Sequence, residues 1–394
     1  MLSSNSELKI KLKKVVILKL VLMLCLNTVI LAAEDSGLSL FITKSEIGIN
    51  RFVEESGVDG RGITVAVIDT GVDPAHPDLM QTTDGHQKII DWVDFTNEGL
   101  VQTPYRAVEI NGEIITPNGN IRIGRINSRS GVFHYGFFRE DQIEEKGFMG
   151  QDVNRDGDSE DSFFVLVVDS KIAGFYDMVW VDTDGDNDLT DEKPLKVFSK
   201  NYDWALFGKK GNKVLSPDHS SFVVTEIDLR GGYVKLGFDG NGHGTHVAGI
   251  LGGNGEIKGI APGVRIMALK ALGSSGDGSW EDISKAMKYA AANGADIVSI
   301  SIGTTFSSKD GTNSHIQLMN YLSTKYNTFF VIAAGNDGPG MSSTTVCGDV
   351  SGVIVVGAYI SPRIWKLNYN YDVPYDGLWY FSGMGPKKDG GIAP

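Results

Sequence analysis

The fold is decided by the stretch NGHGTHVAGI, which occupies residues 241–250. His243 stands between two glycines, and small residues followed by an apolar run come after it. This pattern predicts the start of a buried helix whose first turn has almost no side-chain bulk. A ligand can therefore approach the His243 ring closely.

Two further stretches each predict a buried strand that ends in a polar residue. TVAVIDTGV, residues 64–72, is an apolar run that ends at Asp69 and a glycine turn, and FFVIAAGNDG, residues 329–338, ends at Asn336. Taken singly, Asp69 is equally typical of a turn at a strand end, and Asn336 is more typical of a turn than of a functional site. His243 alone is also compatible with a helix start that makes a local hydrogen bond. The three together predict the parts of one site.

Strand and helix patterns alternate through the second half of the chain. Further strands are predicted at Val264–Ala271, Asp296–Ile302 and Val353–Gly357, and helices at Trp280–Asn293 and Asn313–Tyr326. Val- and Ile-rich strands that alternate with helices predict an α/β fold, with a mainly parallel sheet between helices. Ligand sites of such sheets form at the carboxyl ends of the strands, which is where Asp69 and Asn336 are expected.

The composition is that of a globular protein with an acidic surface. Of 394 residues, 41% are hydrophobic and the net charge is -13, which argues against a nucleic-acid partner. Residues 1–33 combine lysines, an apolar run and a small-residue end, and they predict a cleaved secretory signal peptide; the alternative is an uncleaved anchor. We therefore expect a secreted or extracytoplasmic protein with no lipid anchor and no stable membrane association after cleavage.

The two cysteines, Cys25 and Cys347, predict no internal disulfide, because Cys25 lies in the signal peptide. A catalytic role for Cys347 is disfavoured because nothing beside it resembles an activating partner.

A short helix is predicted at Ser45–Glu55. His76 is a loop residue without an assigned role, and His246 is interpreted as structural.

Residues 101–230 differ in character from the rest and predict an inserted β-rich subdomain, whose ends should lie close together. Short apolar runs alternate with turns there. The expected strands are Phe163–Val168, Met178–Val181, Leu195–Phe198, Phe222–Ile227 and Tyr233–Phe238.

Two acidic loops in this segment are candidate calcium sites, with solvated hairpin turns as the alternative. Each places oxygen ligands at alternate positions, namely Asp152, Asn154, Asp156 and Asp158 in the first and Asp182, Asp184, Asp186 and Asp188 in the second. The first lacks a glutamate at position 12, where Phe163 stands, although Glu160 and Asp161 offer later carboxylates. The second has Asp191 and Glu192 beyond it. No organic cofactor is expected.

The motifs DTGV at 69–72, HGTHVAG at 243–249 and AAGN at 333–336 resemble three signatures of the subtilisin family of serine proteases, in the family's order. The resemblance covers about 40–100 and 231–394. It implies a subtilisin-like peptidase domain formed by 34–100 and 231–394, and protein or peptide substrates. The long interval between Asp69 and His243 is similar to that of the family's large branch, which contains pyrolysin and tripeptidyl-peptidase II.

The resemblance also implies a role for each matching residue. Asp69 would orient the ring of His243, which would act as general base and then general acid. Asn336 would donate to the oxyanion. The remaining matches are substrate-binding positions, namely Ser301, Ile302, Gly303 and Gly335.

One element of the family pattern is missing, since no serine stands in a Gly-Thr-Ser-Met-Ala type motif. We therefore expect that the chain is C-terminally truncated before the catalytic serine, that this fragment is inactive, and that the whole protein is a serine endopeptidase. The alternative is a non-catalytic relative that binds peptides in the same cleft. A calcium-dependent adhesion or scaffold module is a third interpretation, which rests on the acidic loops alone. Side-chain preference, endo- versus exo-cleavage and oligomeric state are left open.

Overall fold

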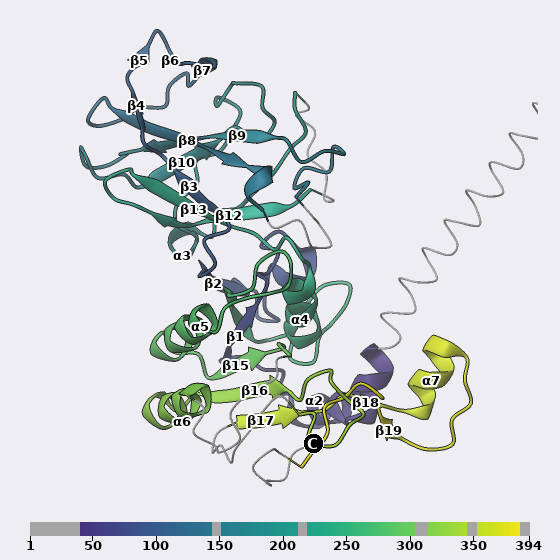
Figure 1. Ribbon diagram of the computed structural model, residues 1–394. Helices are drawn as coiled ribbons and strands as arrows, with labels where there is room; N and C mark the ends of the chain where they lie inside the picture. The colour runs from purple at the N-terminus through teal and green to yellow at the C-terminus, as the bar shows by residue number, and fades with distance from the viewer. Residues whose placement is uncertain (1–39, 144–150, 212–218, 304–313, 345–352, 387–394) are drawn as a thin grey trace, which may run out of the picture. The chain divides into compact units, whose positions relative to one another are not determined.

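The computed structural model describes residues 40–143, 151–211, 219–303, 314–344 and 353–386 (Figure 1). Their contacts define two units. The smaller unit contains residues 40–58 and 359–379, and the larger contains the described residues of 59–358 and 380–386. The predicted signal peptide, Cys25 and Cys347 lie outside the described residues.

A six-stranded sheet, in which every neighbouring pair is parallel, forms the centre of the larger unit. Its spatial order is β17 (Val353–Val356), β16 (Phe329–Ala333), β15 (Ile297–Ile300), β1 (Thr64–Asp69), β14 (Arg265–Lys270) and β2 (Ile89–Asp94). The predicted parallel sheet is confirmed, with strand ends shifted by one or two residues. Because the strands are parallel, their carboxyl ends share one edge of the sheet.

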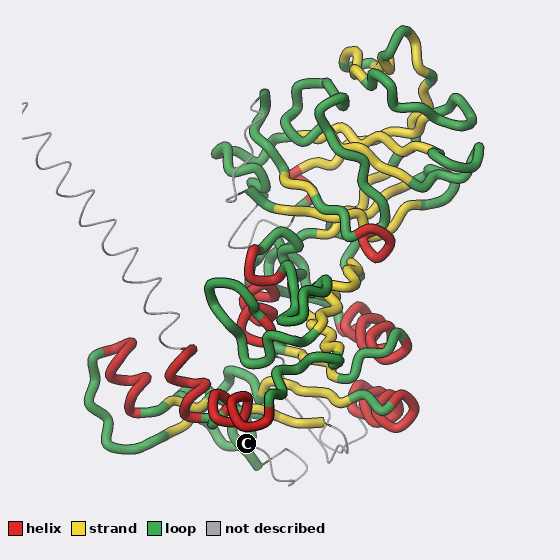
Figure 2. Tube along the Cα trace, turned by 180° about the vertical axis from the view of Figure 1, so that it is seen from behind, coloured by secondary structure: helices red, strands yellow, loops and turns green. Residues whose placement is uncertain are grey.

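Helices cover both faces of this sheet, as Figure 2 shows. Helices α5 (Trp280–Ala292) and α6 (Ser314–Tyr326) pack on one face, and α4 (His243–Gly252) packs on the other. Strand β1 alternates accordingly, because Ala66 and Ile68 face the α5 and α6 side while Val65 and Val67 share a cluster with Ala248 of α4. Burial on both faces explains why this strand is a continuous apolar run. The expected three-layer α/β fold is confirmed.

Antiparallel sheets occupy the segment between β2 and α4. The first consists of β10 (Met178–Val181), β9 (Ser162–Val168), β8 (Phe133–Arg139) and β4 (Tyr105–Ala107). The second consists of β11 (Ala205–Leu206), β12 (Ser221–Ile227), β13 (Tyr233–Gly237) and β3 (Leu100–Gln102). A smaller third sheet contains β5 (Glu109–Ile110), β6 (Glu113–Thr116) and β7 (Gly119–Arg122).

The two four-stranded sheets share one core, in which Phe138 and Phe163 of the first contact Phe207, next to β11, and Phe138 also contacts Phe238, next to β13. Strand β13 pairs with β3, so the two ends of the segment lie side by side. The other face of β12 places Val223 in the core cluster that contains Trp92 of β2. The β-rich segment therefore packs on the sheet that carries the candidate site.

Two predicted elements differ from the structure. The strand expected at Leu195–Phe198 is wrong, because Leu195 forms only an isolated bridge with Val179 and α3 (Phe198–Asn201) begins three residues later. This apolar stretch instead leads into a single helical turn, in which Phe198 is buried against the core. The helix expected at Ser45–Glu55 is split into residues 40–46 and α2 (Ile49–Ser56), since Gly48 between them has φ 76°.

The smaller unit joins its N-terminal helices to a C-terminal hairpin. It contains β18 (Tyr359–Ile360), α7 (Pro362–Tyr369) and β19 (Gly377–Leu378). The Ser361 hydroxyl donates to Glu46 at 2.9 Å and accepts from the backbone N–H of Ile364, so it also caps α7. Within the described part of the chain, no helix has the length and apolar character that crossing a bilayer requires.

Candidate active site

The site is built around Asp69, at the carboxyl end of β1, and His243, the first residue of α4. Asp69 Oδ1 lies 2.7 Å from His243 Nδ1 and also accepts the backbone N–H of Thr70 at 2.8 Å. The Asp69 side chain is 1% exposed, whereas that of His243 is 47% exposed. The buried acid therefore holds one ring nitrogen and leaves part of the imidazole open to solvent.

The glycines around His243 permit this close approach of helix and strand. Gly242 has φ 89°, in the left-handed region that favours glycine. A Cβ on Gly244 would lie 2.0 Å from the Gly71 carbonyl oxygen and 3.0 Å from Asp69 Cβ. Any larger residue at position 244 would push the helix away from the acid, which explains the small first turn that the sequence predicts.

Electrostatics favour a charged imidazole at this position. The hydrogen bond that the His243 ring donates to Asp69 is the main cause that raises the pKa of His243, and the negative charges of Asp69 and Asp239 raise it further, against the lowering effect of partial burial. Asp69 Oδ2 is buried and has no hydrogen-bond partner among the described residues. A buried carboxylate in this state is stabilised by a neighbouring positive charge, so the pair is suited to hold an imidazolium.

Asp239 is a positioning residue that sequence reasoning missed. Its buried carboxylate accepts the N–H of Gly242 at 2.8 Å, the hydroxyl of Thr245 at 2.5 Å and the hydroxyl of Thr70 at 2.8 Å. It thus satisfies free N–H groups at the start of α4 and joins that helix to the turn after Asp69. The sequence feature that could have identified it is an aspartate a few residues ahead of a predicted helix start.

A buried ion pair contacts the turn that follows Asp69. Lys270 of β14 is fully buried, and its ammonium donates to the Thr70 carbonyl at 2.8 Å and lies 3.0 Å from Glu98 Oε2. Glu98 also accepts the backbone N–H of Ser274 at 3.0 Å. Removing one member of a buried pair leaves an uncompensated charge, at a cost of about 3–5 kcal/mol.

The other predicted site residues follow β15, which pairs with β1, and β16, which pairs with β15. Ser301, Ile302 and Gly303 follow β15, and Gly335 and Asn336 follow β16. A Cβ on Gly303 would lie 3.9 Å from Gly335 Cα and 4.0 Å from the Asn336 nitrogen, so these two segments are adjacent. Asn336 is exposed and, within the described ranges, forms no hydrogen bond to Asp69 or His243. All lie at the carboxyl edge of the sheet, and their roles stay predictions.

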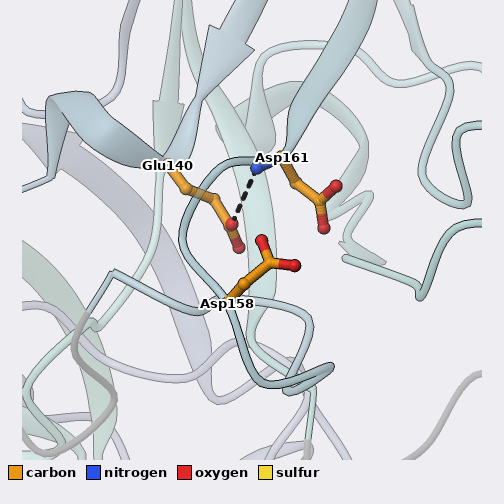
Figure 3. A group of neighbouring side chains, drawn as sticks. All are labelled: Glu140, Asp158 and Asp161. Atoms are coloured by element: carbon orange, nitrogen blue, oxygen red, sulfur yellow. Dashed lines mark hydrogen bonds between the residues drawn. The ribbon is translucent and has the colours of Figure 1, made fainter.

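The first acidic loop gathers carboxylates differently from the prediction. Ligand oxygens of Glu140, Asp158 and Asp161 lie within 4.8 Å of one another, and Figure 3 shows Glu140 accepting the backbone N–H of Asp161. Burial raises the pKa of Glu140 to about 7. Asp152 instead accepts backbone N–H groups of Asp156 and Gly157.

Of the four residues predicted in that loop, Asp152, Asn154, Asp156 and Asp158, only Asp158 belongs to the cluster. Sequence reasoning missed Glu140 because it lies ahead of the loop, in the 3₁₀ turn Glu140–Gln142.

The second acidic loop is closer to its prediction. Asp182, Asp184 and Asp186 place ligand oxygens within 4.8 Å of one another, and Asp182 and Asp184 are buried. Burial, with the neighbouring aspartates, raises the pKa of Asp182 to about 6. The fourth predicted ligand, Asp188, is 2.9 Å from Arg122 instead. Both clusters have the donor chemistry that calcium takes, and calcium binding stays a prediction.

The parallel sheet lies between helix layers. It carries a buried acid at a strand end, next to a glycine-flanked histidine on the covering helix. These features define a hydrolase-like α/β protein. The model of the subtilase family (Peptidase_S8) matches residues 60–394, so the chain belongs to the subtilase family. The resemblance inferred from the three motifs is thereby confirmed.

The relatives that match most of this chain include pyrolysin and tripeptidyl-peptidase 2. Pyrolysin of Pyrococcus furiosus is 37% identical over 418 residues, covering 87% of this chain and 29% of pyrolysin. Tripeptidyl-peptidase 2 of Oryza sativa subsp. japonica is 27% identical, covering 91% of this chain and 31% of that protein. The crystal structure of tripeptidyl peptidase 2 superposes with a TM-score of 0.61 at 18% identity, covering 87% of this chain and 32% of that one. The chain thus spans less than a third of these relatives.

Proposed function

We propose that this chain carries the acid and the base of a serine endopeptidase that hydrolyses peptide bonds in proteins. The observation that carries the proposal is the 2.7 Å contact between buried Asp69 and half-exposed His243. The nucleophile is the serine of the family motif, which none of the serines in residues 1–394 matches. Secretion through the signal peptide at 1–33 is part of the same proposal.

The geometry supports a stepwise proton transfer. His243 Nδ1 donates to Asp69, so the second ring nitrogen accepts the serine proton as the hydroxyl oxygen bonds to the scissile carbonyl carbon. The imidazolium formed is stabilised by Asp69 and by the charge of Asp239. It then gives that proton to the leaving amine, and water repeats the sequence on the acyl-enzyme. Backbone groups of Ser301–Gly303 would pair with the substrate as an added strand.

Asn336→Ala is expected to lower kcat about 100- to 1000-fold with little change in KM, because an oxyanion donor acts mainly in the transition state. The measurement is steady-state peptide hydrolysis by a form of the protein that includes the serine motif. Asn118→Ala, at an exposed turn between β6 and β7, is the control. A rise in KM with unchanged kcat would assign Asn336 to substrate binding instead.

The alternative is a non-catalytic relative that uses the same cleft to bind peptides. The gene sequence beyond codon 394 distinguishes the two proposals. A Gly-Thr-Ser-Met-Ala type motif there favours the peptidase, whereas a continuing subtilase domain without the serine favours the binding protein.

We also propose that the two acidic clusters hold calcium. Calcium at 100 times its Kd would stabilise the fold by about 2.7 kcal/mol. The chain should therefore melt several degrees higher in calcium than in chelator, at about 2–4 °C per kcal/mol. Glu140→Gln combined with Asp184→Asn should abolish the shift, and Asp372→Asn, at an exposed residue outside both clusters, should keep it. An unchanged melting temperature in the parent chain would remove the proposal.

A further inference from the structure

A hollow of about 460 Å³ opens on the β-rich segment, away from every residue assigned above. Three segments form it, namely the turn between β9 and β10, the entry to α3, and the end of β12. The backbone N–H of Tyr176 donates to the Leu229 carbonyl at 3.0 Å, which fixes the first segment to the third. A volume of this order accommodates a few side chains of a ligand.

The floor of the hollow is rigid and mainly apolar. Tyr176 is 4% exposed, its hydroxyl donates to the Val132 carbonyl at 3.1 Å, and its ring packs edge-on against His134. Ile227 and Val197 complete the apolar lining. An apolar side chain entering this hollow would meet preformed walls, so little ordering of the protein is required.

Large apolar side chains are exposed to solvent in the lining of the hollow and in the turn between β9 and β10. Leu229 is 55% exposed, and the turn bonded to it carries Ile172 at 62% and Phe175 at 55%. Single exposed apolar residues are common, but several on one small surface beside an apolar hollow are typical of an interaction site.

The rim is basic although the whole chain is acidic. Lys171, Lys196 and Lys200 line the hollow, and none of the three has an ion pair recorded within the described part of the chain. The acid in the lining, Asp177, is engaged by the backbone N–H and the hydroxyl of Ser170, at 2.8 and 3.0 Å. Against a net charge of -13, this local excess of positive charge favours an anionic ligand.

We propose that this hollow, lined by Tyr176, Val197, Ile227 and Leu229 and rimmed by Lys171, Lys196 and Lys200, is a peptide-binding site. It would take a protein segment in which apolar side chains are flanked by carboxylates, with the apolar group in the hollow and the carboxylates on the lysines. A concave hollow of about 460 Å³ accommodates an inserted side chain, which a flat membrane surface does not supply, and the vesicle arm of the test below separates the two. The site does not depend on whether the chain is a peptidase.

The test is fluorescence anisotropy of the 394-residue chain with labelled twelve-residue peptides. A peptide with a Leu-Phe pair between aspartates is expected to bind at least tenfold more tightly than two matched peptides. One of these replaces the aspartates with lysines, and the other replaces Leu-Phe with Ser-Ser. Equal affinity for all three peptides, or binding of none, would overturn the proposal, as would binding only to anionic phospholipid vesicles.

Charge-reversal variants locate the binding. Lys171→Glu combined with Lys200→Glu should lower the affinity for the acidic peptide at least tenfold, because both rim charges change sign. Lys210→Glu combined with Lys288→Glu makes the same change at two exposed lysines outside the hollow and should leave the affinity unchanged. An equal loss of affinity in both double variants would show unspecific electrostatic attraction and would contradict the proposed binding site. Melting curves of both double variants verify that the fold is retained.

Discussion

His243→Ala is expected to lower kcat/KM for peptide hydrolysis by about 10⁴-fold or more, in a form of the protein that includes the serine motif. Without the ring, a serine hydroxyl has no base within reach, and the leaving amine has no proton donor. The buried Asp69 carboxylate would then lose its partner at 2.7 Å, so a modest loss of stability should accompany the loss of turnover. Steady-state kinetics with a fluorogenic peptide measures the first effect and thermal melting the second.

His246→Ala is the matched control for this variant. His246 lies one turn further along α4, is exposed, and contributes its backbone N–H to the Gly242 carbonyl, which alanine preserves. The control should keep full turnover. Retained activity in the His243 variant would refute the assignment of the base, and equal losses in both variants would indicate damage to the helix rather than to the chemistry.

The central sheet could be predicted because its strands obey one local rule. β1 and the middle of β14 are buried on both faces, so each is an apolar run, and the polar residue that ends β1 marks the sheet edge. Asp69 and His243 were found for the same reason, since each stands at the boundary between an apolar element and a glycine turn. Their contact itself requires the tertiary fold.

Residues that act through long-range packing were missed. Glu140 joins Asp161 because β8 pairs with β9, which brings Arg139 opposite Ser162. Nothing in the spacing of a single loop encodes that pairing. Asp239 and Lys270 were missed because each bonds to the distant turn after Asp69, Asp239 through the Thr70 hydroxyl and Lys270 through the Thr70 carbonyl. A buried lysine at the end of an apolar strand carries no local pattern. At Leu195–Phe198, composition favoured a strand, and the packing of Phe198 on the core selected a helical turn.

Asp69→Asn is expected to reduce turnover about 10⁴-fold while leaving the fold intact, because an amide no longer holds the productive tautomer of His243. The substitution should also lower the pKa of His243, since the hydrogen bond that the ring donates to the Asp69 carboxylate is the main cause that raises it. A general base works unprotonated, so the acid limb of kcat/KM follows this pKa. In the parent protein that limb should lie above the usual histidine value of about 6.5, and in the variant it should move to lower pH.

The same shift predicts how stability depends on pH. Because the folded-state pKa of His243 exceeds its unfolded value, its contribution is fully present below about pH 6.5 and is lost as pH rises through the folded pKa. Parent and Asp69→Asn should therefore differ most in melting temperature at low pH and converge at high pH. NMR titration of the His243 ring in the 394-residue chain, assigned with His243→Ala, measures the pKa without any turnover, and Asp372→Asn is the control. An unchanged His243 pKa in the Asp69 variant would show that the contact does not govern the charge of the ring. The role proposed for Asp69 in the mechanism would then be wrong.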